Sequence, residues 1–516
     1  MIGDRDLIAR FGSPLYVYDL ARVRAALDDL RAALPRGAKV LFSLKANPHP
    51  DLARVLRLGG CHGELSSVGE LATALAAGFS PADCLYTGPG KTAEEIGEAV
   101  ALGVRRFSVE SDRDLRRVGA VAAAAGVVAH CLLRVNGARA AGGAGMRMTG
   151  VASQFGFDIE TLPYNGDPDV PGTRVVGFHF FPLTNAQDEE TLCAELEGSV
   201  RAAALLQKER GLPVDVLDIG GGFSAPYARA GERPVYRTLR PRLEAALDEH
   251  FPDWREGAPQ VYFESGRYLV ADCGRLLCTV TDVKESRQAT YAVLDTGIHH
   301  LGGMSGLGRL LPLSAVPHTV DGGDERDDAG GPRDGEPGAV TLAGPLCTPA
   351  DVLSRSVEVT DLRPGAPLVI PNVGAYGLTA SLLGFLSRPA AREVVLDGDH
   401  VASVSRLTLQ RTEEKETTAV DTQAVDTQAV DTQTDGAWDE VYEGVLRAAL
   451  PRLPREGRLE ADTDLIAAGL DSLAMVELVV RLEQAFAVSL PDETLTAAAF
   501  ATPGSLWDVV ESGRQS

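Results

Sequence analysis

The feature that most constrains the fold is a regular alternation of short apolar segments and helical segments between about residues 38 and 266. Most of the apolar runs precede an Ala-, Leu-, Arg- and Glu-rich segment with helical spacing, such as 51–57 and 69–75. Eight strand-and-helix units in about 230 residues match a (β/α)8 barrel, and an open doubly wound sheet is the alternative. Polar residues at the carboxyl ends of nearly every strand favour the barrel. The expected strands end at Lys45, Ser67, Gly88, Ser111, Asn136, Pro182, Gly220 and Ser265.

The rest of the chain divides by composition. After residue 272 the strands lack helical spacers, which predicts a β-domain of residues 273–411 that also takes 1–24, leaving 25–272 to the barrel. A polar, Gly-rich insertion at 321–332 is expected to be disordered. Residues 412–436 contain Ala-Val-Asp-Thr-Gln three times in tandem, which predicts a flexible acidic linker. Residues 437–516 return to helical patterns and predict a small all-α bundle.

Charge and cysteine usage limit the partners and the compartment. The formal net charge of -23 argues against nucleic acid or an anionic membrane, because phosphates would be repelled. The acidity gathers in residues 437–516, with 14 Asp and Glu against 6 Arg. Seven cysteines without CxxC spacing indicate a reducing compartment. No signal core or membrane span is recognisable, so we expect a cytoplasmic protein.

Three strand ends carry groups that suit one cofactor. Lys45 ends an apolar strand, the glycines 220–222 follow the seventh strand, and Glu264 ends the eighth strand three residues before Arg267. An amine, a turn whose backbone N–H groups can cradle a phosphate, and a charged partner for a pyridine nitrogen are the requirements of pyridoxal phosphate. Alone, a strand-end lysine is more often a solvated cap, so the prediction depends on the constellation.

Residues 1 to about 411 resemble the fold-type III pyridoxal-phosphate-dependent decarboxylases, the group of diaminopimelate and ornithine decarboxylases, whose barrel is related to that of alanine racemase. The order and spacing of seven motifs carry the resemblance. They are Ser43-Leu44-Lys45-Ala46-Asn47, Glu64-Leu65-Ser66-Ser67-Val68-Gly69-Glu70, Gly88-Pro89-Gly90-Lys91, Gly220-Gly221-Gly222-Phe223, Glu264-Ser265-Gly266-Arg267, Gly344-Pro345-Leu346-Cys347 and Gly374-Ala375-Tyr376-Gly377.

The resemblance implies roles for these residues. Lys45 would bond covalently to the cofactor, and Glu264 would keep its pyridine nitrogen protonated. Cys347, donated across the interface of a homodimer with shared active sites, would return a proton to the product; a buried, inert thiol is the alternative. No metal is implied. The cofactor-binding residues that the resemblance implies are Lys45, Glu64, Arg134, Phe181, Thr184, Gly220, Gly221, Gly222, Glu264, Arg267 and Tyr376.

Two departures from the family pattern are informative. A histidine usually stacks on the cofactor after the sixth strand, but here Phe181 takes that place and Thr184 the phosphate-binding hydroxyl, unless a register slip restores His179. Relatives that bind a free diamino acid carry an acidic residue after the motif cysteine, and this chain has Thr348. The missing charge argues against lysine, ornithine or diaminopimelate as the substrate.

A second site lies in the predicted bundle, where Ser472 stands in Gly469-Leu470-Asp471-Ser472-Leu473. An N-cap serine is the plain alternative. The segment from 437 to about 513 resembles the acyl and peptidyl carrier proteins, which implies a 4′-phosphopantetheine arm on Ser472, added by a phosphopantetheinyl transferase. A helix N-terminus suits the arm's phosphate. Acidic residues such as Glu477 and Glu483 would face basic partner enzymes.

The two resemblances together predict a carbon–carbon lyase (EC 4.1.1) of secondary-metabolite or antibiotic biosynthesis. It would remove the α-carboxyl group of a glutamyl- or aspartyl-type residue held as a thioester on Ser472, because only a dicarboxylic amino acid keeps a free α-carboxylate there. An aminoacyl ligase would load the carrier. Two alternatives stay open: a decarboxylase or racemase of a free amino acid whose carrier serves a later step, and a barrel that only holds the cofactor.

Overall fold

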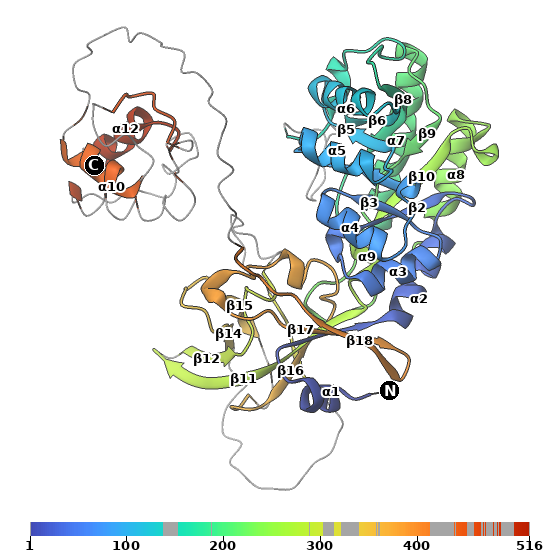
Figure 1. Cartoon of the computed structure of the whole chain (residues 1–516). Helices are drawn as coiled ribbons and strands as arrows, with labels where there is room; N and C mark the ends of the chain where they lie inside the picture. Colours follow the sequence, from blue (N-terminus) through green and yellow to red (C-terminus); the bar gives the residue numbers. More distant parts are fainter. Residues whose placement is uncertain are drawn as a thin grey trace. The chain divides into compact units, whose positions relative to one another are not determined.

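The computed structural model describes residues 2–137, 153–186, 188–287, 289–302, 314–320, 340–357, 359, 362–412 and, beyond these, 438, 440–450, 459–465, 468, 470, 478, 482, 485–486 and 500–514. The chain forms two compact units, Met1–Thr412 and Glu413–Ser516 (Figure 1). The predicted insertion at 321–332 and all but the first residue of the predicted linker lie outside the described residues.

Eight parallel strands of the first unit form a closed barrel (Figure 1). Neighbouring strands pair in the order β5-β4-β3-β2-β10-β9-β8-β6, and the pairing of β5 with β6 closes the ring. The barrel prediction is therefore confirmed over the open sheet, and each strand ends within two residues of its expected end. The strands are β2 (Lys39–Ser43), β3 (His62–Leu65), β4 (Cys84–Tyr86), β5 (Arg106–Val109), β6 (Ala129–Asn136), β8 (Thr173–Phe180), β9 (Val216–Asp218) and β10 (Gln260–Ser265), and β7 (Phe157–Asp158) pairs beside β6.

Helices that follow the strands cover the barrel, and polar caps fix where several of them begin. Ser67 and Ser111 accept hydrogen bonds from the third residues of their helices, and Thr92 with Glu95 forms a capping box. Each cap leaves the preceding strand-end loop short and defined. The helices are α2 (Leu20–Ala33), α3 (Pro50–Leu58), α4 (Val68–Ala76), α5 (Ala93–Ala101), α6 (Asp112–Ala124), α7 (Glu189–Arg210), α8 (Leu239–His250) and α9 (Arg267–Val270).

A layer of side chains fills the barrel interior. Its members come from five of the eight strands, and they are Leu41, Leu85, Leu132, Val176 and Tyr262. All five are buried. The barrel is therefore a packed core, and polar groups are left to the carboxyl ends of the strands.

The β-domain is one nine-stranded sheet. The N-terminal strand β1 (Leu15–Asp19) joins it as expected, because it pairs antiparallel with β11 and parallel with β17. Helix α1 (Asp4–Phe11) precedes that strand. The other strands are β11 (Gly274–Ser286), β12 (Ala289–Leu294), β13 (His318–Thr319), β14 (Val340–Ala343), β15 (Val352–Val357), β16 (Pro367–Ile370), β17 (Arg392–Asp397) and β18 (His400–Arg406).

The second unit has an apolar core of its own. Helices α10 (Glu440–Ala449) and α12 (Pro503–Arg514) meet where the rings of Tyr442 and Trp507 pack edge to face, with centroids 4.8 Å apart. The Tyr442 hydroxyl donates to the Pro503 carbonyl at 2.7 Å. No helix among the described residues of either unit is long and apolar enough to cross a membrane.

Candidate active site at the barrel mouth

Lys45 lies directly after strand β2 in a short turn, η1 (Leu44–Ala46). Its Nζ lies 3.1 Å from Oε1 of the buried Glu64, at the end of β3, and Thr87 Oγ1 donates to the same oxygen at 2.6 Å. Burial alone would lower the pKa of the Lys45 ammonium, but Glu64 and Glu264 outweigh it and raise that pKa above its ordinary value. Burial would raise the pKa of Glu64, but Lys45 outweighs it and lowers that pKa to about 2. The two groups therefore form an ion pair at neutral pH.

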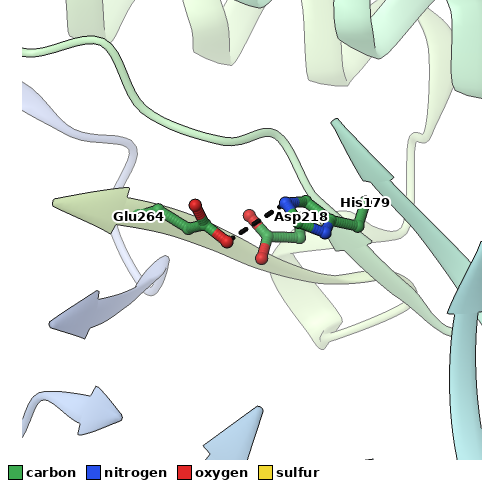
Figure 2. A group of neighbouring side chains, drawn as sticks. All are labelled: His179, Asp218 and Glu264. Carbon is green, nitrogen blue, oxygen red and sulfur yellow. Dashed lines mark ion pairs between the residues drawn. The ribbon is translucent and has the colours of Figure 1, made fainter. Parts of the chain in front are cut away.

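A second buried polar cluster spans the three neighbouring strands β8, β9 and β10 (Figure 2). His179 of β8, Asp218 of β9 and Glu264 of β10 bring their polar atoms within 4.8 Å of one another. His179 Nε2 lies 3.1 Å from Glu264 Oε1, and His179 Nδ1 lies 2.7 Å from Ser108 Oγ. Burial and the neighbouring Glu264 raise the pKa of Asp218 to about 8, and Glu264 raises the pKa of His179 against the effect of burial. The cluster thus favours a charged His179 and a neutral Asp218.

Phe181, and not His179, faces the cavity around Lys45. The Lys45 Nζ lies 5.5 Å from the centroid of the Phe181 ring, and Thr184 lines the same cavity. His179 is buried, does not line this cavity, and pairs with Glu264. The lining of this cavity therefore includes the Phe181 ring and no imidazole.

The glycine turn after β9 is packed too tightly for side chains. A Cβ on Gly220 would lie 2.3 Å from the Phe180 carbonyl oxygen, and one on Gly221 would lie 2.3 Å from the Glu264 carbonyl oxygen. The turn can therefore present only backbone groups to a ligand. Gly222 also has a left-handed φ of +112°.

Arg267 and Tyr376 lie together at this end of the barrel. The Arg267 guanidinium carbon lies 4.9 Å from the centroid of the Tyr376 ring. The Tyr376 backbone N–H donates to the Ala46 carbonyl at 2.7 Å, which ties the β-domain to the residue after Lys45. The β-domain thus supplies part of the barrel mouth.

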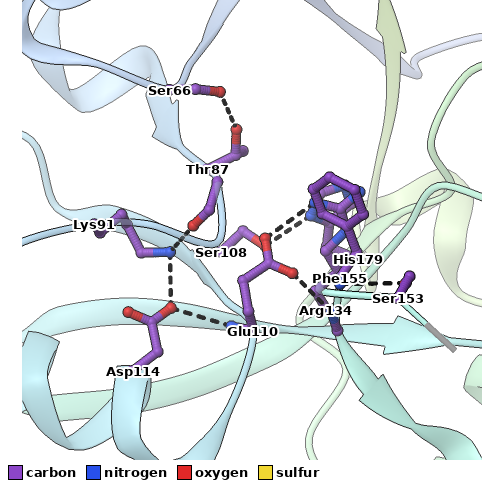
Figure 3. Close-up of polar contacts among 12 residues, drawn as sticks. Ser66, Thr87, Lys91, Ser108, Glu110, Asp114, Arg134, Ser153, Phe155 and His179 are labelled. Atoms are coloured by element: carbon purple, nitrogen blue, oxygen red, sulfur yellow. Dashed lines mark hydrogen bonds and ion pairs between the residues drawn. The ribbon is translucent and has the colours of Figure 1, made fainter. Parts of the chain in front are cut away.

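The cavity at Lys45 has a volume of about 380 Å³. Arg134 lines it and pairs with the buried Glu110 at 3.0 Å (Figure 3). Lys91 also lines it, and its Nζ lies 2.7 Å from Asp114 Oδ2. Sequence reasoning named Arg134 but missed the partners of these cations. Spacing carried no signal for Glu110, because its contact with Arg134 joins neighbouring strands.

Cys347 lies on a different part of the first unit. It is the only exposed cysteine of the seven and does not line the Lys45 cavity. Its loop is held by the buried Asp351, whose carboxylate accepts from the backbone N–H groups of Ile298 at 2.8 Å and Leu346 at 2.7 Å. The exposed thiol contradicts the alternative of a buried small hydrophobe. Ser472 lies outside the described residues.

Comparison with known proteins identifies both halves of the chain. Residues 20–271 match the pyridoxal binding domain of the pyridoxal-dependent decarboxylases, and residues 445–510 match the phosphopantetheine attachment site. The L-glutamyl-[BtrI acyl-carrier protein] decarboxylase of Niallia circulans is 30% identical over 75% of this chain and 90% of its own length. Diaminopimelate decarboxylase of Pseudomonas aeruginosa is 31% identical over 77% of this chain and 91% of its own length.

A solved structure gives the same fold. Diaminopimelate decarboxylase of Helicobacter pylori, complexed with L-lysine, aligns with a TM-score of 0.65 and 22% identity over 78% of this chain and 95% of its own. The fold, the two domain matches and the full-length relatives agree, and this chain belongs to the pyridoxal-dependent decarboxylases and ends in a phosphopantetheine attachment domain.

Proposed function

We propose that the chain removes the α-carboxyl group of a dicarboxylic amino acid, glutamate or aspartate, held by its side-chain carboxyl as a thioester on a carrier domain. The observation that carries this proposal is the presence of a pyridoxal-dependent decarboxylase and a phosphopantetheine attachment domain in one chain. The Niallia relative, whose name describes a glutamyl group on a carrier protein, supports it. Thr348 supports it too, because no carboxylate stands immediately after Cys347 to hold a distal ammonium.

The residues at the barrel mouth fit pyridoxal phosphate. The glycines 220–222 leave a backbone-lined turn that a Cβ would fill, and Arg267, over the Tyr376 ring, supplies a positive charge for a phosphate. Lys45 reaches into the cavity with 41% of its side chain exposed, while Glu264 is buried behind it. Phe181 offers a ring on which the cofactor can stack. The glycines and Arg267 would hold the phosphate, and Lys45 would bond to the aldehyde carbon. Glu264 would pair with the pyridine nitrogen, and Phe181 would contact the ring face.

Bound pyridoxal phosphate supplies an aldehyde for the substrate amine and a ring that takes up the electron pair released with carbon dioxide. The chain's own residues do the rest. Lys45 must lose the proton that Glu64 and Glu264 stabilise before its amine can act as a nucleophile. Glu264, whose Oε1 lies 3.1 Å from His179 Nε2, would pair with the pyridine nitrogen. The Cα–carboxylate bond breaks as carbon dioxide leaves. A proton must then add to the same carbon to form a C–H bond.

Cys347 is our candidate for the donor of that proton. Because its thiol is exposed and does not line the Lys45 cavity of its own chain, we propose that it serves the partner's cavity in a homodimer. The proposed arm on Ser472 further requires a phosphopantetheinyl transferase and a ligase that loads the amino acid.

The test uses the full-length protein with and without the carrier attachment. Holo-protein loaded with glutamate is expected to lose one carbon dioxide mass per chain in intact-protein mass spectrometry once pyridoxal phosphate is added. A Ser472→Ala variant is expected to release none from free glutamate or aspartate. Equal release from the free amino acids by that variant would replace this proposal with a free amino acid decarboxylase, the activity named for the diaminopimelate relatives.

A further inference from the structure

A second hollow lies in the β-domain, apart from the Lys45 cavity. It has a volume of about 670 Å³ and is formed by the turn 383–390, before β17, and by residues 406–411, which follow from the end of β18. None of its lining residues lines the Lys45 cavity. We call it the 388 groove, after the arginine at its edge.

The 388 groove is positively charged in a strongly acidic chain. Its charged lining residues are Arg388, Arg406 and Arg411, and it contains no carboxylate. Within the described residues, none of the three arginines has a carboxylate at ion-pair distance. In a chain with a net charge of -23, three guanidinium groups without neutralising partners favour an anionic ligand, and a guanidinium matches the geometry of a phosphate.

The uncharged residues that line the groove are of two kinds, apolar and polar. Leu383, Pro389, Leu407 and Leu409 give the groove apolar walls, and Leu409 is 73% exposed. Ser387, Thr408 and Gln410 add side-chain donors and acceptors. A ligand that matches this lining carries a negative charge, an apolar group and hydrogen-bonding groups.

The groove adjoins the loop of Cys347. Arg388 Nη2 donates to the Pro345 carbonyl at 3.2 Å, two residues before the cysteine. The turn that presents Arg388 contains Leu386 and Ser387 with left-handed φ values of 55° and 53°, which residues with a Cβ rarely adopt. Such strain persists only where the surrounding structure enforces it, and it gathers at functional sites.

We propose that the 388 groove binds the phosphodiester and the adjoining dimethyl and amide groups of a phosphopantetheine arm, while its thioester end reaches the active site that Cys347 serves. The arm has the three required characters: a phosphodiester charge, a branched apolar carbon and two amides. This inference rests on the proposed function, because only a carrier-bound substrate has such an arm.

The test compares two soluble substrates on the full-length protein with Ser472 unmodified. These are γ-L-glutamyl-S-pantetheine and γ-L-glutamyl-S-(4′-phosphopantetheine), which differ only in the phosphate. We expect the phosphorylated thioester to have a KM about tenfold lower, which is the size of one good charge-assisted contact. In an Arg406→Ala/Arg411→Ala variant the ratio of the two KM values is expected to fall toward one. Arg388 is left intact because it also holds Pro345.

Arg363→Ala is the matched control, since Arg363 is an exposed arginine of the same domain outside the groove, and its KM ratio is expected to equal that of the wild type. Equal KM values for both thioesters in the wild type overturn the inference and leave the proposed function standing. An unchanged ratio in the double variant overturns it as well. A double variant that changes the oligomeric state without changing the ratio assigns the groove to a contact between two copies. Failure to decarboxylate either thioester would contradict the proposed function itself.

Discussion

The barrel mouth and the Cys347 loop organise their polar groups in opposite ways. At the mouth, buried carboxylates meet cations at short range, as in Glu64 with Lys45 and Glu110 with Arg134. In the loop, one buried carboxylate, Asp351, holds two backbone N–H groups and leaves the neighbouring thiol exposed. The mouth thus offers paired charges to a ligand. The loop offers a fixed backbone shape and an exposed thiol.

The largest expected effect is at the mouth. Lys45→Ala removes the amine that pairs with Glu64 at the cavity, and we expect turnover to fall on the order of 10⁴-fold or more, as when a covalent nucleophile is lost. Borohydride reduction of the wild type with pyridoxal phosphate, followed by peptide mapping, is expected to place the label on Lys45. Labelling of Lys91, which lines the same cavity, in place of Lys45 would show that the amine is misassigned.

At the loop, Cys347→Ala is expected to leave cofactor binding intact and to slow turnover by about 10²–10⁴-fold, the usual value of a positioned proton donor. Pyridoxal phosphate affinity and turnover are measured together. Mixing this variant with Lys45→Ala is expected to recover part of the activity, because one mixed site would then hold both native groups. No recovery in mixed dimers would mean that each site is built from a single chain.

A smaller effect is expected at Asp351, which does not touch the cavity. Asp351→Asn keeps the size of the side chain but turns one of its two acceptors into a donor, so one of the N–H groups of Ile298 and Leu346 loses its partner. We expect turnover to fall by about tenfold, from roughly 1–3 kcal/mol lost at that group.

The measurement for Asp351 pairs turnover with the rate at which iodoacetamide alkylates Cys347. The exposed Asp169→Asn makes the same charge change away from the loop and is expected to alter neither quantity. A normal alkylation rate and normal turnover in Asp351→Asn would show that the loop keeps its shape without the carboxylate.

The difference between the two regions also explains what the sequence could predict. The eight strands and the residues at their ends followed from apolar periodicity, because parallel strands bring their carboxyl ends to one rim. The partners Glu110 and Asp114 did not follow, because Glu110 pairs with Arg134 of strand β6 and Asp114 with Lys91 of the loop after β4, and no local spacing records such contacts. The role of Asp351 was hidden for the same reason, since it joins Leu346 to Ile298 across 48 positions of sequence.

The remaining expected effect is on the pH dependence of stability, not on turnover, and compares the β-domain with the barrel mouth. Glu393, on β17 of the β-domain, is buried, and its carboxyl oxygen Oε1 accepts a hydrogen bond from the Tyr18 hydroxyl at 3.0 Å. Burial raises the pKa of Glu393 from 4.5 to about 7, although the Tyr18 hydrogen bond opposes the shift. The pKa of Glu64 moves the other way, to about 2, because Lys45 neutralises it.

The two carboxyl groups therefore act on stability with opposite signs. Between about pH 4.5 and 7 the folded protein keeps the proton of Glu393 while the unfolded chain releases it, so the stabilisation is complete below pH 4.5 and is lost as pH rises through 7. Glu64 stabilises the fold above pH 4.5, and its contribution is lost only as pH falls toward 2. Glu393→Gln is expected to remove about 3 kcal/mol of pH dependence between pH 4.5 and 8 in urea unfolding. A wild type and a variant with parallel pH profiles would show that Glu393 is ionised in the folded β-domain.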